Sequence, residues 1–334
     1  MKLARIHGPG DLRLDEVPEP ELGPDDVILR VGACGICGSD VGYAKIGGVQ
    51  GPADSPMPIG HELAGTVTEV GGNVNGIAIG DRVALNPGAA GFGLGNGGPE
   101  GGFARNLLIR GAAQGKSLFK IPDDMSFEIA ALAEPLGVGM HAVNQVNVQP
   151  DDRVVILGGG PIGLSSAATL LDRGIEEIVV VDLSSARLEV ARALGVKHTV
   201  HAASEDLWET LGKIHGRQVY YGADVVNSSV FIEATGSGSL LEEVINRCAP
   251  KARISVVALH RKPVPVSFML VLMKQIMLQG SMEYPERYED MLEMLGRRDL
   301  SPMITHRYGL DDFIEAFAIA QSPDAGAKVM IGMD

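Results

Sequence analysis

A glycine-rich turn near the middle of the chain constrains the fold more than any other feature of the sequence. The apolar run 154–157 is typical of a strand, residues 158–163 read Gly-Gly-Gly-Pro-Ile-Gly, and the segment 162–171 is helical in character. In a Gly-x-Gly-x-x-Gly motif the glycines permit the turn, let a diphosphate approach the backbone, and let the helix pack closely on the strand. We therefore predict a βαβ unit of a doubly wound parallel sheet that binds a dinucleotide. The predicted cofactor-binding residues of the turn are Gly158, Gly160, Pro161, Ile162 and Gly163.

An acidic residue beyond the turn indicates which dinucleotide is bound. Asp182 lies nineteen residues after Gly163, at the end of the next strand-like run, 178–181. A carboxylate there can accept hydrogen bonds from the adenosine-ribose hydroxyls and would repel a 2′-phosphate, so we expect NAD rather than NADP. The alternative is a glycine-rich turn followed by an unrelated surface aspartate. Arg187 either contacts the same ribose or lies on a solvated helix face.

The first 140 residues or so differ in composition: they are rich in Gly and Pro and contain short alternating or apolar runs such as 26–31 and 63–70. That pattern predicts a β-rich domain of short strands and tight turns. A chain of 334 residues exceeds the size at which one core usually stops growing, so two domains are expected. The stretch 86–102 holds eight glycines in seventeen residues, and we expect an irregular loop with little packing of its own.

Charge and composition exclude several classes of protein. With 28 basic and 42 acidic residues the net charge is −14, so no broad basic surface exists and we expect no nucleic-acid partner. The start lacks the apolar core of a signal peptide, and no run is long and apolar enough to span a membrane. Three cysteines cannot build a disulfide framework. We expect a cytoplasmic protein with no membrane partner.

Four metal-capable side chains lie upstream of the glycine turn. Cys37 lies in Gly-Ile-Cys-Gly-Ser-Asp, His61 and Glu62 follow Gly60, and Glu134 opens Glu-Pro-Leu. One thiolate, one imidazole and carboxylate oxygens suit Zn²⁺, and a catalytic zinc keeps one position for water or substrate. Taken alone, Cys37 could be a buried apolar residue and His61 a hydrogen-bonded loop histidine.

These motifs occur, together with Gly-Asp-Arg-Val at 80–83, in the order found in zinc-dependent medium-chain dehydrogenases. The chain resembles that family along nearly its whole length, and most of all its sorbitol (polyol), butanediol and threonine dehydrogenase branch. The resemblance implies an α/β protein with a GroES-like catalytic domain, 1–140 and 285–334, and an inserted Rossmann NAD-binding domain, 141–284. It also implies a homodimer or homotetramer, paired through the segment 276–278.

The resemblance also implies roles for single residues. Cys37, His61 and Glu62 would ligate one catalytic zinc, and Glu134 would be the fourth ligand or would hold a zinc-bound water. Ser39 would lie beside the alcohol oxygen as the proton relay, and Asp40 would accept a hydrogen bond from His61 and orient its ring. Ser39 and Asp40 could instead only cap a helix.

Two departures from the family limit the substrate, and a third concerns the structural zinc. In the polyol branch Gly-Ser-Asp-Val is followed by His-Tyr, whereas here Val41 is followed by Gly42 and Tyr43. Sorbitol dehydrogenases carry an Arg-Tyr pair where this chain has Glu283-Tyr284, so we expect a sugar alcohol to be a poor substrate. The loop 86–102 replaces a lobe with four cysteines, so no structural zinc is expected. The expected substrate-pocket residues are Tyr43, Glu283 and Tyr284.

The sequence therefore predicts an NAD-dependent zinc alcohol dehydrogenase that reversibly oxidises a small secondary alcohol, diol or polyol-like, to the ketone. A neighbouring possibility is a threonine-type or primary-alcohol dehydrogenase. A possibility from another class is a non-catalytic dinucleotide-binding protein of the same fold.

Overall fold

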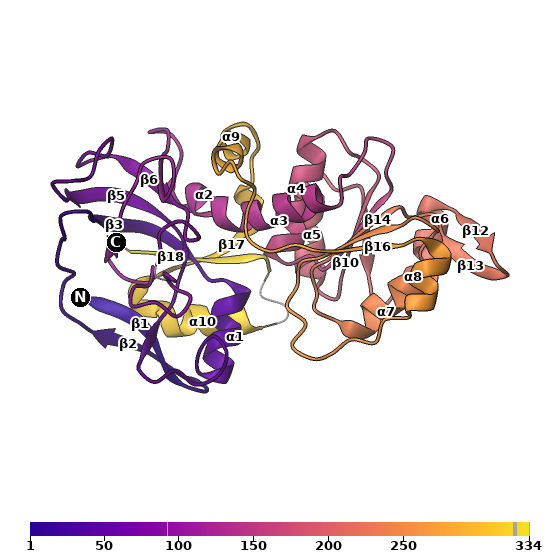
Figure 1. Ribbon diagram of the computed structural model, residues 1–334, viewed down its shortest axis with the longest axis horizontal. Helices are drawn as coiled ribbons and strands as arrows, with labels where there is room; N and C mark the ends of the chain where they lie inside the picture. The colour runs from indigo at the N-terminus through magenta and orange to yellow at the C-terminus, as the bar shows by residue number, and fades with distance from the viewer. Residues whose placement is uncertain (92, 323–325, 334) are drawn as a thin grey trace. The chain divides into compact units, whose positions relative to one another are not determined.

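The computed structural model describes residues 1–91, 93–322 and 326–333. The chain divides into two compact units (Figure 1). The terminal unit contains Met1–Glu134 and Arg287–Asp334, and the central unit contains Pro135–Glu286. The sequence placed these boundaries after residue 140 and before residue 285.

The terminal unit is built on a seven-stranded sheet in which the two ends of the chain meet. Its order is β17-β18-β3-β5-β6-β8, with β7 also paired to β3. The strands are β3 (Val27–Gly35), β5 (Glu62–Val70), β6 (Arg82–Leu85), β7 (Asn106–Ile109), β8 (Leu118–Lys120), β17 (Ile304–Gly309) and β18 (Lys328–Gly332). A three-stranded sheet is ordered β2 (Asp11–Glu16), β1 (Lys2–Gly8), β4 (Met57–Pro58). The helices are α1 (Gly38–Ile46), α2 (Phe127–Ala131), η1 (Ser301–Met303), α9 (Glu289–Arg297), η2 (Leu310–Asp312) and α10 (Phe313–Gln321).

Strand register in this sheet brings distant motifs together. In the antiparallel pair β3–β5, Gly35 lies opposite Glu62, and in the pair β18–β3, Gly35 lies opposite Met330. The segment after β3, the start of β5 and the start of β18 therefore meet at one end of the sheet. A core of buried aliphatic and aromatic side chains, which includes Phe103 and Phe313, packs against these strands and holds them in place.

The glycine-rich stretch 86–102 contributes to this core. Ala90 and Leu94 are buried within it, so the expectation of little packing is wrong for these positions. Glycines let the backbone pass close to its neighbours, and the few side chains between them fill the space below.

The central unit confirms the fold class, because it is a doubly wound parallel sheet. Its order is β11-β10-β9-β14-β15-β16, and every neighbouring pair is parallel. The strands are β9 (Val154–Leu157), β10 (Ile178–Asp182), β11 (His198–His201), β14 (Val230–Glu233), β15 (Arg253–Val256) and β16 (Met277–Gly280). The helices are α4 (Pro161–Asp172), α5 (Ser185–Ala193), α6 (Leu207–His215), α7 (Gly238–Arg247) and α8 (Phe268–Lys274), with a hairpin of β12 (Arg217–Tyr220) and β13 (Ala223–Val226). Helix α3 (Ala133–Gln145) spans the boundary between the units.

Sequence order along this sheet reverses between β9 and β14, which defines its switch point. Every residue of β9 is buried, as expected of a strand covered on both faces. Ligands of such sheets bind outside the carboxyl ends of the strands at the switch point.

In the described part of the chain, no helix combines the length and apolar character needed to cross a bilayer.

Candidate metal centre and cofactor turn

Three of the four proposed metal-binding side chains meet where β3, β5 and α1 come together. Cys37 stands immediately before α1, while His61 and Glu62 enter β5. The Cys37 thiol, a His61 ring nitrogen and a Glu62 carboxylate oxygen all lie within 4.8 Å of one another. Glu134, in the first turn of α3, is buried but does not join this group among the described residues.

The charges around His61 suit a cation held between these donors. Its Nδ1 atom is buried near Asp40 and makes no hydrogen bond among the described residues. Burial alone would lower the pKa of His61, but the neighbouring Asp40 and Cys37 outweigh burial and raise that pKa well above its usual value. A thiol, an imidazole and carboxylates gathered out of water match the donors that Zn²⁺ prefers.

Asp40 supports the metal centre through the backbone. Its Oδ2 accepts a hydrogen bond from the Cys37 N–H at 2.9 Å, and its Oδ1 accepts one from the Gly60 N–H at 3.3 Å. The expected hydrogen bond with His61 is not formed, because Nδ1 lies 3.7 Å from Asp40 Oδ1. Asp40 therefore caps α1 and ties the Cys37 and His61 segments together, and burial raises its pKa above the usual value.

Glu62 has a partner that the sequence did not reveal. Lys328, the first residue of β18, places its Nζ 2.7 and 2.5 Å from the two carboxylate oxygens and 3.1 Å from the Ile36 carbonyl oxygen. Both side chains are about 1% exposed. Burial would lower the pKa of Lys328, but the attraction of Glu62 outweighs it and the pKa is raised. The carboxylate of Glu62 is thus shared between a buried ammonium and any metal beside Cys37 and His61.

Ser39 and Tyr43 lie on α1, the helix that follows Cys37. The Ser39 hydroxyl oxygen is 3.5 Å from His61 Nε2. Tyr43 donates a hydrogen bond to Asn96 Oδ1 at 3.1 Å, which links α1 to the glycine-rich stretch. Sequence reasoning did not single out Asn96, an exposed residue, because nothing in a glycine-rich loop marks which residue contacts α1.

Glycines 95, 101 and 102 enclose the backbone that carries His61. Gly102 donates its N–H to the Gly60 carbonyl at 2.8 Å. A Cβ atom built at Gly95 would lie 2.3 Å from the Gly60 oxygen, and one at Gly101 would lie 2.5 Å from the Ile59 oxygen. These neighbours are backbone atoms and cannot move aside cheaply. This glycine-rich loop therefore packs directly against the segment that carries His61.

We expect Gly95→Ala to displace Gly60 and lower zinc affinity at least about tenfold, as loss of a supporting contact typically does. The free energy of unfolding should fall by roughly 2–4 kcal/mol, from overpacking together with a left-handed φ of 66°. Gly91→Ala is the matched control, because Gly91 has a φ of 71° but nothing within 4 Å of its Cβ position. It should lose only about 1–2 kcal/mol and keep its zinc. Metal titration and urea unfolding measure both variants, and equal zinc affinity in the two would contradict the role of Gly95.

The glycine turn of the central unit has the geometry of a dinucleotide site. Gly158 has a φ of 103°, and a Cβ at Gly163 would lie 1.8 Å from the Gly158 oxygen. Gly160 precedes α4 and Pro161 occupies its first turn. Among the described residues, apart from the chain neighbours of Gly160, no atom lies within 4 Å of its Cβ position, which leaves space for a ligand at the amino end of α4. Free backbone N–H groups at such an end favour phosphate.

Asp182 ends β10 beside this turn. Its Oδ2 accepts the Gly159 N–H at 2.6 Å and its Oδ1 accepts the Ser184 N–H at 2.7 Å. Arg187 approaches the same carboxylate, with Nη1 3.8 Å from Oδ2. Asp182 thus orders the turn while keeping further lone pairs for a ligand's hydroxyls. The side chain of Ile162, in the first turn of α4, is half-buried.

Glu283 and Tyr284 belong to the central unit, whereas Tyr43 belongs to the terminal unit. Glu283 is exposed and has a φ of 68°, a left-handed conformation that is unusual for a residue other than glycine. It lies in the short segment that follows β16.

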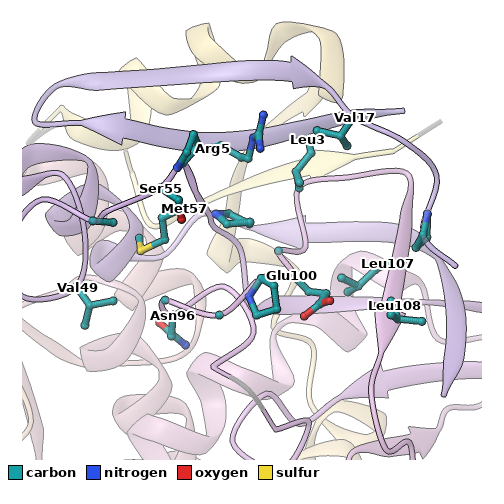
Figure 2. Close-up of a pocket in the computed structure, with 18 of the residues that line it drawn as sticks. Leu3, Arg5, Val17, Val49, Ser55, Met57, Asn96, Glu100, Leu107 and Leu108 are labelled. Atoms are coloured by element: carbon teal, nitrogen blue, oxygen red, sulfur yellow. The ribbon is translucent and has the colours of Figure 1, made fainter. Parts of the chain in front are cut away.

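A large surface cavity of the terminal unit lies apart from the proposed metal ligands. It has a volume of about 1370 Å³ and is bordered by β1, β4, β7 and the segments 49–58 and 96–101. Figure 2 shows Arg5, Met57, Asn96 and Leu108 around it. Its arginines are already paired, Arg5 with Asp15 and Arg110 with Glu100. None of the metal-binding candidates lines it.

Comparisons with known proteins agree with this geometry. Residues 23–123 match the alcohol dehydrogenase GroES-like domain, and residues 161–297 match the zinc-binding dehydrogenase family. The chain is 33% identical to sorbitol dehydrogenase from Rattus norvegicus over 347 residues, which covers 98% of this chain and 95% of the rat protein. The crystal structure of 2R,3R-butanediol dehydrogenase from Bacillus subtilis superposes with a TM-score of 0.87 at 27% identity, covering 100% of this chain and 99% of that one. A zinc-binding dehydrogenase from Sinorhizobium meliloti 1021, solved with NADP, gives 0.83 at 25% identity with 99% of each chain covered.

Proposed function

The chain belongs to the zinc-dependent medium-chain dehydrogenases, and from that membership we propose its reaction, its nucleotide and its substrate class. It is a zinc-dependent oxidoreductase that acts on CH–OH donors. The reaction best supported is reversible oxidation of a secondary alcohol, a vicinal diol above all, to the ketone. The observation that carries this proposal is the meeting of Cys37, His61 and Glu62 within 4.8 Å beside the Ser39 hydroxyl.

Each residue of the site has a task in this reaction. When bound, zinc would supply Lewis-acid polarisation of the substrate hydroxyl, and the nicotinamide would supply the hydride acceptor. Cys37 and His61 would hold the metal, with Glu62 contributing an oxygen as its bond to Lys328 allows. Ser39 would accept the proton of the substrate hydroxyl and pass it to water. Glu134, outside the ligand group, would act through water.

We propose NAD as the nucleotide, because the carboxylate of Asp182, which accepts the Gly159 and Ser184 N–H groups beside the glycine turn, can also accept hydrogen bonds from the adenosine-ribose hydroxyls. A 2′-phosphate would bring a second negative charge against this carboxylate.

We expect Asp182→Ser to weaken NAD binding by about 1.5–3 kcal/mol, the range for hydrogen bonds to a charged group, and to ease entry of NADP. The ratio of kcat/KM for NAD⁺ to that for NADP⁺ measures the effect. Asp206→Ser is a suitable control, since Asp206 caps α6 through the Glu209 N–H and serine also caps helices. Wild-type protein with the higher kcat/KM for NADP⁺ would contradict the role of Asp182.

An alcohol panel with NAD⁺ at mildly alkaline pH tests the substrate class. We propose that 2,3-butanediol is oxidised faster than sorbitol, because Glu283 stands where polyol relatives carry arginine. Glu283→Arg should then shift the ranking of kcat/KM towards sorbitol, and an unchanged ranking would mean that Glu283 is not at the substrate. Preferred turnover of threonine or a primary alcohol would support the neighbouring alternative. Absence of turnover with any alcohol, together with NADH binding, would support a non-catalytic protein.

We also propose a homodimer or homotetramer. Strand β16 is an edge of the central sheet, and exposed apolar side chains lie on the preceding helix α8, at Phe268, Met269 and Leu272. An open strand edge beside exposed apolar groups suits a second copy of the same surface across a twofold axis. Elution at monomer size in size-exclusion chromatography would contradict this.

Three free cysteines among the described residues support a reducing compartment, and we propose the cytoplasm.

A further inference from the structure

We propose that His260 is a positioning residue for the nicotinamide half of the cofactor, acting through its hydrogen bond to the buried Glu233. The inference rests on the proposed use of a nicotinamide dinucleotide. It assigns a function to a carboxylate and an imidazole outside the glycine turn and the metal centre.

Glu233 is a fully buried carboxylate whose side chain is hydrogen-bonded to the turn after β14 and to the segment after β15. It is the last residue of β14 and is 0% exposed. Its Oε1 accepts the N–H groups of Thr235 at 2.8 Å and of Gly236 at 2.9 Å, and also the Thr235 hydroxyl. Its Oε2 lies 2.8 Å from Nε2 of His260, whose side chain is 13% exposed. One carboxylate therefore ties the turn after β14 to the segment after β15.

The main chain of Glu233 holds the same segment. Its carbonyl oxygen accepts N–H groups from Val257 at 3.0 Å and Ala258 at 3.1 Å. Those bonds fix the start of the segment, and the bond to His260 fixes it two residues further on. Removing the imidazole would leave Oε2 buried without this donor, which is costly, and would free the backbone beyond Ala258.

These loops lie where the second half of a dinucleotide would be bound. A Cβ at Gly158 would lie 3.0 Å from the Ala234 oxygen, and one at Gly236 would lie 3.2 Å from the Leu259 oxygen. The turn after β14 therefore packs between the glycine turn and the His260 segment. Asp182 ends β10, on the other side of the switch point from β14 and β15. With the diphosphate at the glycine turn and the adenosine towards Asp182, the nicotinamide nucleoside extends towards β14 and β15.

The test compares NADH with ADP-ribose, which has the same adenosine and diphosphate but no nicotinamide. We expect His260→Ala to raise the Kd for NADH about tenfold, the equivalent of one lost hydrogen bond to a charged group, and to leave the Kd for ADP-ribose within about twofold. His260→Gln should recover part of the NADH affinity, since its amide can donate to Glu233. Calorimetry measures both ligands, and the blue-shifted emission of bound NADH reports the nicotinamide separately.

His215→Ala is the matched control. His215 is also buried in the central unit, and its Nδ1 is hydrogen-bonded to Ser228. Ser228 precedes β14 and therefore lies at the amino ends of the parallel strands, away from Glu233 at the carboxyl end. Its loss should change the two Kd values together. His260→Asn, too short to reach Glu233, gives the same test if His260→Ala does not fold. Equal weakening of both ligands, or of neither, in the His260 variants overturns the inference. If the wild-type protein binds neither NADH nor ADP-ribose, the proposed dinucleotide-dependent function is itself contradicted.

Discussion

We expect Cys37→Ser to remove most of the zinc and to lower kcat/KM by at least about a thousandfold. Cys37 supplies the only thiol of the group that meets within 4.8 Å, and a serine hydroxyl is a poor ligand at neutral pH because it stays protonated. Lewis-acid stabilisation of a developing alkoxide contributes several kcal/mol, and each 1.36 kcal/mol corresponds to a factor of ten in rate. Metal analysis and kinetics on the same preparation measure the two losses together. Wild-type protein should hold about one zinc per chain.

Cys34→Ala is the control for this experiment. Cys34 lies three residues earlier on β3, is fully buried, and is not part of the metal-binding group. Burial raises the pKa of its thiol well above the usual value. Its replacement should leave zinc content unchanged. If Cys37→Ser keeps both zinc and activity, Cys37 is not a ligand, and two tightly held zinc ions per wild-type chain would reveal a further site.

Lys328→Met should lower the free energy of unfolding of zinc-free protein by about 3–5 kcal/mol. The methionine has a similar length but leaves the carboxylate of Glu62 buried without its ammonium, and an uncompensated buried charge costs this much. With zinc bound, the loss should be smaller, because the metal can take over the freed carboxylate. Urea unfolding with and without zinc measures the difference.

The double variant Glu62→Gln/Lys328→Met separates the lost charge pair from lost packing. Removing both charges should recover much of the stability, since a neutral amide is less costly to bury than an unpaired carboxylate. The double-mutant cycle then gives a coupling energy for the pair. Zinc-free Lys328→Met as stable as the wild type would show that the pair does not form in solution.

Local patterns in the sequence were sufficient for the strand and helix that flank the glycine turn. The apolar run 154–157 is strand β9 to the residue, and the predicted helix lies within α4. Both depend on neighbours in the chain, because the turn needs glycine at set spacings and a buried parallel strand needs a continuous apolar run.

Contacts that depend on how distant strands pair could not be predicted from the sequence. Lys328 lies 266 positions from Glu62, and only the order of β18, β3 and β5 brings them together. The sequence also assigned Asp40 to His61, whereas its oxygens are bonded to the backbone of Cys37 and Gly60. Asp40 is close enough to the ring for attraction, but the two N–H donors fix its orientation. Spacing identified the residues, but not the partner that each one takes.

The position of β18 in the sheet has a consequence for synthesis. This strand lies between β17 and β3, and it carries the ammonium that neutralises Glu62. On the ribosome, residues 1–134 emerge first, and the whole of the central unit, 135–286, is translated before β18 exists. Until then β3 has an open edge on that side and Glu62 has no cation, so the amino-terminal segment cannot reach its final state. The inserted unit is contiguous in sequence and is free to fold meanwhile, so residues 1–134 complete their sheet only after the central unit has been made.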